Sequence, residues 1–194
     1  MSPTSELMVS ADTIILGFAI ARLLHGASGI FSKNKSSLTI IFVWISCCIH
    51  IAITLWTNTN RFELRLDFLD FVLQLIYASI CYFMCDSLTP HNAEKIESFS
   101  HHFISIRKKY WSCHISMSLL AAVMFEKYQA YDLFIEKYEM VYLFIITPWL
   151  LISLFGFFAK SKQYQFIAAL LFLILIIFNS SVTLFESASL TNKI

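Results

Sequence analysis

Long apolar runs separated by short polar segments are the first feature of this chain. A helix that crosses the hydrocarbon core of a bilayer needs about 20 mostly apolar residues. Six runs predict such helices, at about 12–31, 39–57, 67–86, 110–126, 140–159 and 164–185. The pattern therefore predicts an all-α, polytopic membrane protein with six transmembrane helices, formed as a single domain over residues 1–194.

The segment between the third and fourth runs has a different periodicity. Thr89-Pro90 has the form of a helix start, and apolar residues then recur at steps of three and four. This apolar face contains Ile96, Phe99, Phe103 and Ile106. We expect a cytoplasmic amphipathic helix over about 90–109, which either lies at the membrane surface or extends the fourth span. Its apolar face is a membrane anchor or a surface for a partner.

Composition agrees with a membrane protein. Apolar residues make up 58% of the chain and charged residues 14%, whereas an ordinary soluble domain carries about 25% charged residues. The net charge of +1 implies no basic face and argues against nucleic acid as a partner. The lipid bilayer is the expected partner, and a homo-oligomer or a membrane complex stays open. The five cysteines lie in or beside apolar runs and are expected to be buried free thiols.

Lysine and arginine are distributed unevenly between the loops. The loops after the first, third and fifth predicted helices hold eight of them, and the tails and other loops hold five. Cytoplasmic loops are enriched in these residues. The distribution predicts an integral membrane protein with both termini on the extracytoplasmic side.

Polar residues interrupt the first three predicted helices. Ionisable residues inside a membrane are costly and face protein or water rather than lipid. At about 1.5 Å per residue, Arg22, His50 and Gln74 fall near the middle of the bilayer. We predict an intramembrane polar cluster in which Asp70 neutralises Arg22 and Asp67 lies at the outer mouth. Its members are Arg22, His25, His50, Asp67, Asp70 and Gln74.

Two functions fit this cluster. The first is a non-catalytic sensor or membrane subunit of a larger assembly, in which the polar residues fix helix packing. The second is an ion- or proton-conducting channel or transporter with a polar path between the first three helices. Histidine suits such a path because it changes charge near neutral pH.

Residues Gly26-Ala27-Ser28-Gly29 resemble the tetrapeptide that carries the nucleophilic serine of rhomboid intramembrane proteases. That resemblance implies a serine nucleophile in a six-helix fold. In rhomboids, however, the serine begins a late helix, whereas here the tetrapeptide ends the first. His50 lies about 12 Å from Ser28 along the helix axis, beyond the reach of a nucleophile–base pair. We therefore predict no catalytic residues, and interpret the small residues as a close-packing face.

Metal and cofactor motifs are sparse. The sequence contains no HExxH, CxxC or P-loop spacing, so no metal site is predicted. His25 and His114 have comparable predicted depths on different helices. A b-type haem held by these two histidines is the one cofactor that the sequence leaves open.

Overall fold

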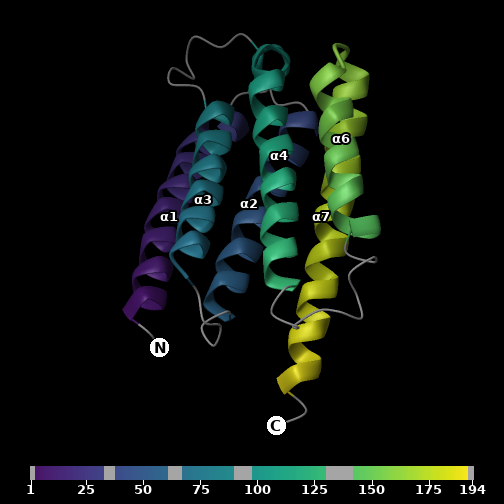
Figure 1. The fold of residues 1–194 in the computed structure, drawn as a ribbon. Coiled ribbons are helices and arrows are strands. Elements are labelled where there is room, and N and C mark those ends of the chain that lie inside the picture. Colours follow the sequence, from purple (N-terminus) through teal and green to yellow (C-terminus); the bar gives the residue numbers. More distant parts are fainter. Residues whose placement is uncertain (1–2, 33–37, 61–66, 90–97, 130–141, 192–194) are drawn as a thin grey trace.

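The computed structural model is a bundle of helices (Figure 1). It describes residues 3–32, 38–60, 67–89, 98–129 and 142–191, and these contain no β-strand. The elements in chain order are α1 (Pro3–Ser32), α2 (Leu38–Asn60), α3 (Phe68–Leu88), α4 (Phe99–Gln129), the π-helical turn η3 (Tyr142–Ile146), α6 (Thr147–Phe158) and α7 (Lys162–Thr191).

Four helices are long and apolar enough to cross a membrane. Their apolar stretches are Val9–Gly26, Leu38–Leu55, Phe68–Leu88 and Lys162–Ser181. A shorter apolar helix covers Leu143–Phe158. These elements confirm an all-helical chain whose long apolar helices fit a multi-pass membrane protein. Four of the six predicted spans correspond to such helices.

Successive helices run up and down the bundle. In Figure 1, α1 begins and α7 ends at the lower end of the molecule. Helix α1 packs against α2 and α3, α4 packs against α3 and α6, and α7 packs against α2 and α6. Consequently α1 and α3 are neighbours that run in the same direction.

The expected amphipathic helix is not a separate element among the described residues. Residues 90–97, with Ile96, lie outside the described part of the chain. From Phe99 onward the segment is the first part of α4, which continues without a break to Gln129. Phe99 and Phe103 are buried in the core and Ile106 packs against it, so these residues do not form an open surface for a partner. The described residues therefore agree with the alternative in which the segment extends the fourth helix, and the apolar face packs into the bundle core.

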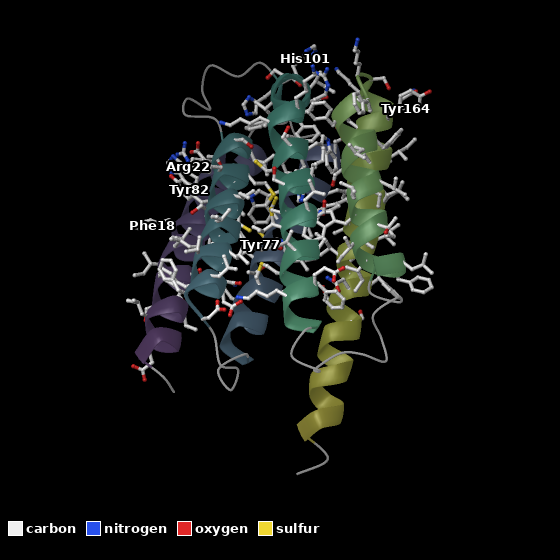
Figure 2. All side chains as sticks on the ribbon, viewed as in Figure 1. Phe18, Arg22, Tyr77, Tyr82, His101 and Tyr164 are labelled. Carbon is white, nitrogen blue, oxygen red and sulfur yellow. The ribbon has the colours of Figure 1, made fainter. Side chains whose placement is uncertain are left out.

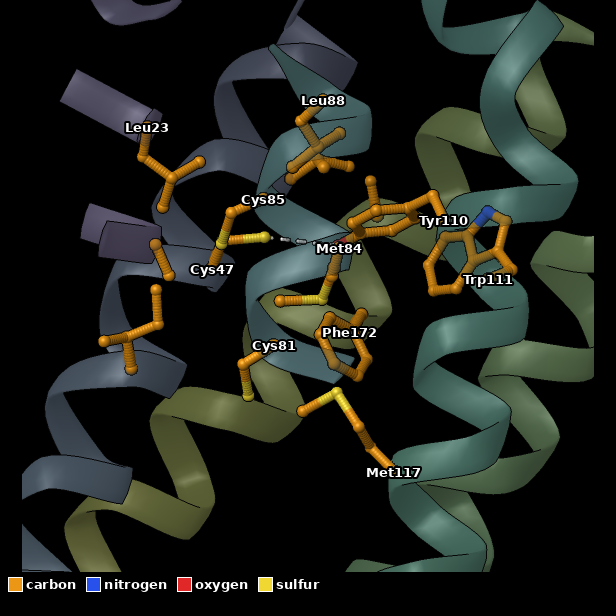
Figure 3. Close-up of a cluster of buried hydrophobic side chains, with 14 of the residues drawn as sticks. Leu23, Cys47, Cys81, Met84, Cys85, Leu88, Tyr110, Trp111, Met117 and Phe172 are labelled. Carbon is orange, nitrogen blue, oxygen red and sulfur yellow. Dashed lines mark hydrogen bonds between the residues drawn. The ribbon is translucent and has the colours of Figure 1, made fainter. Parts of the chain in front are cut away.

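Sulfur and aromatic side chains fill the centre of the bundle (Figure 3). Cys47, Cys81 and Cys85 are completely buried, and the Cys47 Sγ lies 3.8 Å from the Tyr110 hydroxyl. All five cysteines are free thiols, as their positions in the apolar runs predict. Such polarisable side chains fill irregular gaps between helices.

The outer surface of the bundle carries many large apolar side chains. Phe18 of α1, Phe83 of α3 and Phe178 of α7 are each more than half exposed. A soluble monomer rarely exposes so much apolar surface in contiguous patches. Such a surface is compatible with contact with lipid.

Candidate functional site

Polar side chains join different helices inside the bundle. Five pairs, which we call the interior polar contacts, carry most of this network. They are Arg22–Asp86, Asp70–Lys127, His50–Tyr77, His114–Trp149 and Trp111–Gln165. Arg22–Asp86 and His50–Tyr77 join helices in which the sequence predicts polar residues, and Asp70 of the second pair lies on such a helix.

Arg22 pairs with Asp86 rather than with Asp70. Its Nε donates a hydrogen bond to Asp86 Oδ1 at 2.8 Å, and both side chains are about three-quarters buried. The predicted Arg22–Asp70 pair is therefore wrong. Figure 2 shows Arg22 near the upper end of the bundle, well above Tyr77 at mid-height.

The register between α1 and α3 explains this correction. The Thr89 hydroxyl, just past the end of α3, donates to the Arg22 carbonyl at 3.1 Å. A Cβ atom on Gly26 would lie 2.8 Å from the Thr89 Oγ1, so the small residue permits this close approach. Arg22 therefore lies level with the end of α3. Counting residues from the end of α1 predicts a deeper position, near the middle of the bilayer. Gly26 supports the close-packing interpretation, and the side chain of Ser28 lies outside the described residues.

Asp70 pairs with Lys127 of α4. The Lys127 Nζ lies 2.7 Å from Asp70 Oδ1 and 2.6 Å from Asp67 Oδ1. Asp67 caps α3, because its carboxylate accepts from the Asp70 backbone N–H while the Asp70 carboxylate accepts from the Asp67 N–H. The hydrogen bond from Lys127 lowers the pKa of Asp67, which precedes the apolar part of α3. The sequence places Lys127 in a loop, since the fourth predicted span ends at residue 126.

Gln74 is buried and hydrogen-bonds with Asp12 of α1. The exposed fractions of these residues are 3% and 2%. This carboxyl–amide contact fastens α1 to α3 about three turns below the Arg22 pair. Asp12 stands at the predicted start of the first span, where the sequence gives no sign of burial.

Two histidines meet in the core. The His50 Nε2 lies 2.8 Å from the Tyr77 hydroxyl, and the Trp149 Nε1 donates to the His114 Nδ1 at 3.4 Å. The two imidazole rings are 6.4 Å apart between centroids. His114 is completely buried, and its Nε2 has no hydrogen-bond partner within the described residues. Because Nδ1 accepts this hydrogen bond, the Nε2 of His114 carries the ring hydrogen, so the core holds an N–H donor without an acceptor among the described residues, beside a second histidine.

The predicted haem pair is not brought together. His25 is exposed on α1, whereas His114 is enclosed by aromatic rings of α4, α6 and α7. Within the described part of the chain, no group of three His, Cys, Asp or Glu side chains is placed to hold a metal ion. The histidine that faces His114 is His50, which the sequence places deeper in the membrane.

A glutamine links three helices at the other side of the bundle. Gln165 of α7 accepts from Trp111 Nε1 at 2.8 Å, and its amide nitrogen donates to the carbonyls of Gly156 and Ala159 at 2.6 Å each. Every polar atom of this buried side chain is thus used. The sequence signal for this contact is a lone glutamine at the start of a strongly apolar helix.

Charge is separated between the two ends of the bundle. The end at which α4 and α7 begin, here named the basic end, carries Arg107, Lys108, Lys109, Lys160 and Lys162. The opposite end, the acidic end, carries Glu6, Asp12, Asp67, Asp70 and Glu126. Among the described residues, the exceptions are the paired Asp86 at the basic end and the paired Lys127 at the acidic end.

Comparisons with protein-family models, with curated proteins and with solved structures give no match. The interior polar contacts and the charge separation are therefore the features from which a function is argued.

Proposed function

We propose that the chain is a non-catalytic, multi-pass membrane protein that acts as a sensor or as a membrane subunit of a larger assembly. The observation that supports this function is the pairing of the buried polar side chains. Each interior polar contact joins two different helices, so that α1, α2, α3, α4, α6 and α7 are all included.

Pairing of this kind suits a scaffold. A polar group without a partner is penalised in hydrocarbon, so each contact favours one relative position of two helices. At Lys127 and Arg22, the short distances of 2.6–2.8 Å pair each cation with carboxylates of the chain itself. A path for ions needs polar groups that exchange partners with water, whereas these groups hold each other.

Six membrane crossings with both termini outside the cytoplasm form part of this proposal. The crossings beyond the four long apolar helices are α4 and the η3–α6 pair, which run alongside the others in Figure 1. The charge separation supports the orientation, because cytoplasmic ends of membrane helices are enriched in Lys and Arg. In this orientation the basic end faces the cytoplasm.

A proton-conducting channel or transporter is the second candidate, favoured by the His50–His114 neighbourhood. The Nε2 of His114 is a buried N–H donor without an acceptor among the described residues, and His50 already contacts the Tyr77 hydroxyl. A relay through these rings involves α2, α3 and α4, whereas the sequence predicts a path between the first three helices.

Proton flux into liposomes distinguishes the two functions. The purified protein is reconstituted with an entrapped pH-sensitive dye, and a valinomycin-clamped potential drives proton entry. A scaffold leaves the flux at the level of protein-free liposomes. Conduction instead produces flux that His50→Phe removes, while His101→Gln, an exposed histidine at the basic end, leaves it unchanged.

A further inference from the structure

A shallow groove lies at the turn between α6 and α7, at the basic end. Its volume is about 660 Å³. Leu154, Phe155, Phe158 and Tyr164 form its apolar walls, and Lys160 and Ser161 stand at its rim. The apolar helix α6 ends at this turn and the apolar helix α7 begins there. In the proposed orientation the groove therefore lies at the boundary between the hydrocarbon core and the lipid headgroups.

The walls of this groove face outward. The exposed fractions of Phe158, Tyr164 and Phe155 are 71%, 55% and 41%. Aromatic side chains at this depth are typical of the membrane–water interface. An acyl chain laid against them covers apolar area that no described part of the protein covers.

Positive charge surrounds the rim. Lys160 and Lys162 are exposed, and the Lys162 Nζ lies 3.5 Å from the His101 Nε2 (Figure 2 shows His101 and Tyr164 at the same end). Lys108 lies over the Phe157 ring at 5.7 Å from its centroid. Within the described residues of this end, Asp86 is the acidic side chain and Arg22 neutralises it. Among the described residues, a negatively charged headgroup thus meets lysines without an unpaired carboxylate at the same end.

We propose that this groove binds an anionic phospholipid of the cytoplasmic leaflet. One acyl chain lies along Leu154, Phe158 and Tyr164, and the headgroup phosphate lies between Lys160 and Lys162. The inner leaflet is rich in anionic lipid, and each lysine near its surface contributes attraction. The inference rests on the orientation proposed above, and it is independent of the choice between scaffold and channel.

Native mass spectrometry of the full chain tests this site. The purified protein, in a neutral detergent, is titrated with dioctanoyl phosphatidylglycerol, dioctanoyl phosphatidylcholine or inorganic phosphate. We expect one phosphatidylglycerol to bind in preference to phosphatidylcholine, and inorganic phosphate not to compete at equal concentration. Equal binding of the two lipids overturns the proposal, and so does full competition by phosphate, which indicates a headgroup site without a chain groove.

Variants locate the binding. Lys160→Gln and Lys162→Gln each weaken phosphatidylglycerol binding about fivefold, and together about thirtyfold. Lys109→Gln removes the same charge from the same end, but Lys109 belongs to α4 and not to the turn between α6 and α7, and the variant leaves binding within about twofold. Phe158→Ala weakens both lipids, because it shortens the apolar wall. Equal loss in Lys109→Gln and Lys160→Gln contradicts a local site. The flux assay reads the proposed function separately from this binding.

Discussion

Gly156 lies where α6 passes close to Trp111 of α4. A Cβ atom at this position would be 2.2 Å from the Trp111 Cε2. The carbonyl of the same glycine accepts from Gln165, whose side chain also holds the Trp111 ring. One residue without a side chain thus permits both the ring packing and the hydrogen bonds that join three helices.

Gly156→Ala is therefore expected to destabilise the bundle. The added methyl group displaces a buried indole, and overpacking of this kind costs about 1–3 kcal/mol. Thermal and denaturant unfolding of the purified protein in detergent measures the change. Gly17→Ala is the matched control, since nothing lies within 4 Å of a Cβ there, and we expect it to be neutral or slightly stabilising. Equal stability of the two variants contradicts this packing.

The Arg22–Asp86 pair predicts a specific coupling. In a double-mutant cycle, Arg22→Leu and Asp86→Leu couple by about 1 kcal/mol of unfolding free energy, because each removes the partner of a largely buried charge. Arg22→Leu and Asp70→Leu, whose groups have different partners, add within about 0.5 kcal/mol. The opposite result, in which Arg22 couples to Asp70 but not to Asp86, would contradict the register of α1 against α3.

At the scale of elements, α4 determines much of the arrangement. It contains both the end of the segment predicted as an amphipathic helix and the run 110–126 predicted as the fourth span. Residues 99–129 contain neither glycine nor proline, so no residue ends the helix between these two parts. Its C-terminal turns run past the predicted end of the span, and this extension brings Lys127 beside the start of α3.

The contact between α3 and α4 predicts a pH dependence. The Asp67 pKa is lowered in the folded chain by the hydrogen bond from Lys127. The folded state therefore binds this proton less readily than the unfolded state, whose carboxyl titrates near pH 4. The stability contributed by the pair is present above about pH 4 and is lost as the pH falls through the lowered pKa.

Melting temperatures of the wild type and of Asp67→Asn, measured from pH 7 down to pH 3, test this dependence. We expect the wild type to melt higher at pH 7 and the difference to shrink below about pH 4. Glu6→Gln, which removes a carboxylate from α1 at the same end, serves as the control for net charge. A difference that is constant or grows on acidification is inconsistent with the pair.

At the scale of the whole molecule, hydrophobic periodicity predicts the helices and the membrane character but not the polar partners. Arg22, His50, Asp70 and Gln74 are recognisable because an isolated polar residue stands out in an apolar run. Their partners depend on the axial register of neighbouring helices, which close contacts such as Gly26 on Thr89 determine. No local pattern encodes that register. Trp111 and Gln165 are missed for the same reason, although each is conspicuous in its own helix.

The proposed orientation predicts which end reacts from outside the cell. Glu6→Cys at the acidic end reacts with a membrane-impermeant maleimide in intact cells, whereas Ser161→Cys at the basic end reacts only after permeabilisation. The wild type controls for the native thiols, which are buried or half-buried. The reverse pattern contradicts a cytoplasmic basic end.

The central claim is that the interior polar contacts are made within the chain and are closed to water. Cys47, Cys81 and Cys85 are native probes of this interior, because all three are completely buried among the same helices. The decisive measurement is modification of the liposome-embedded protein by methyl methanethiosulfonate, located by peptide mass spectrometry, with the unfolded chain as the reference for full reaction. A closed core leaves these three thiols unmodified, while a cysteine placed at the exposed Ser161 (Ser161→Cys) reacts as it does in the unfolded chain. Modification of Cys47, Cys81 and Cys85 at the rate of the unfolded chain contradicts it.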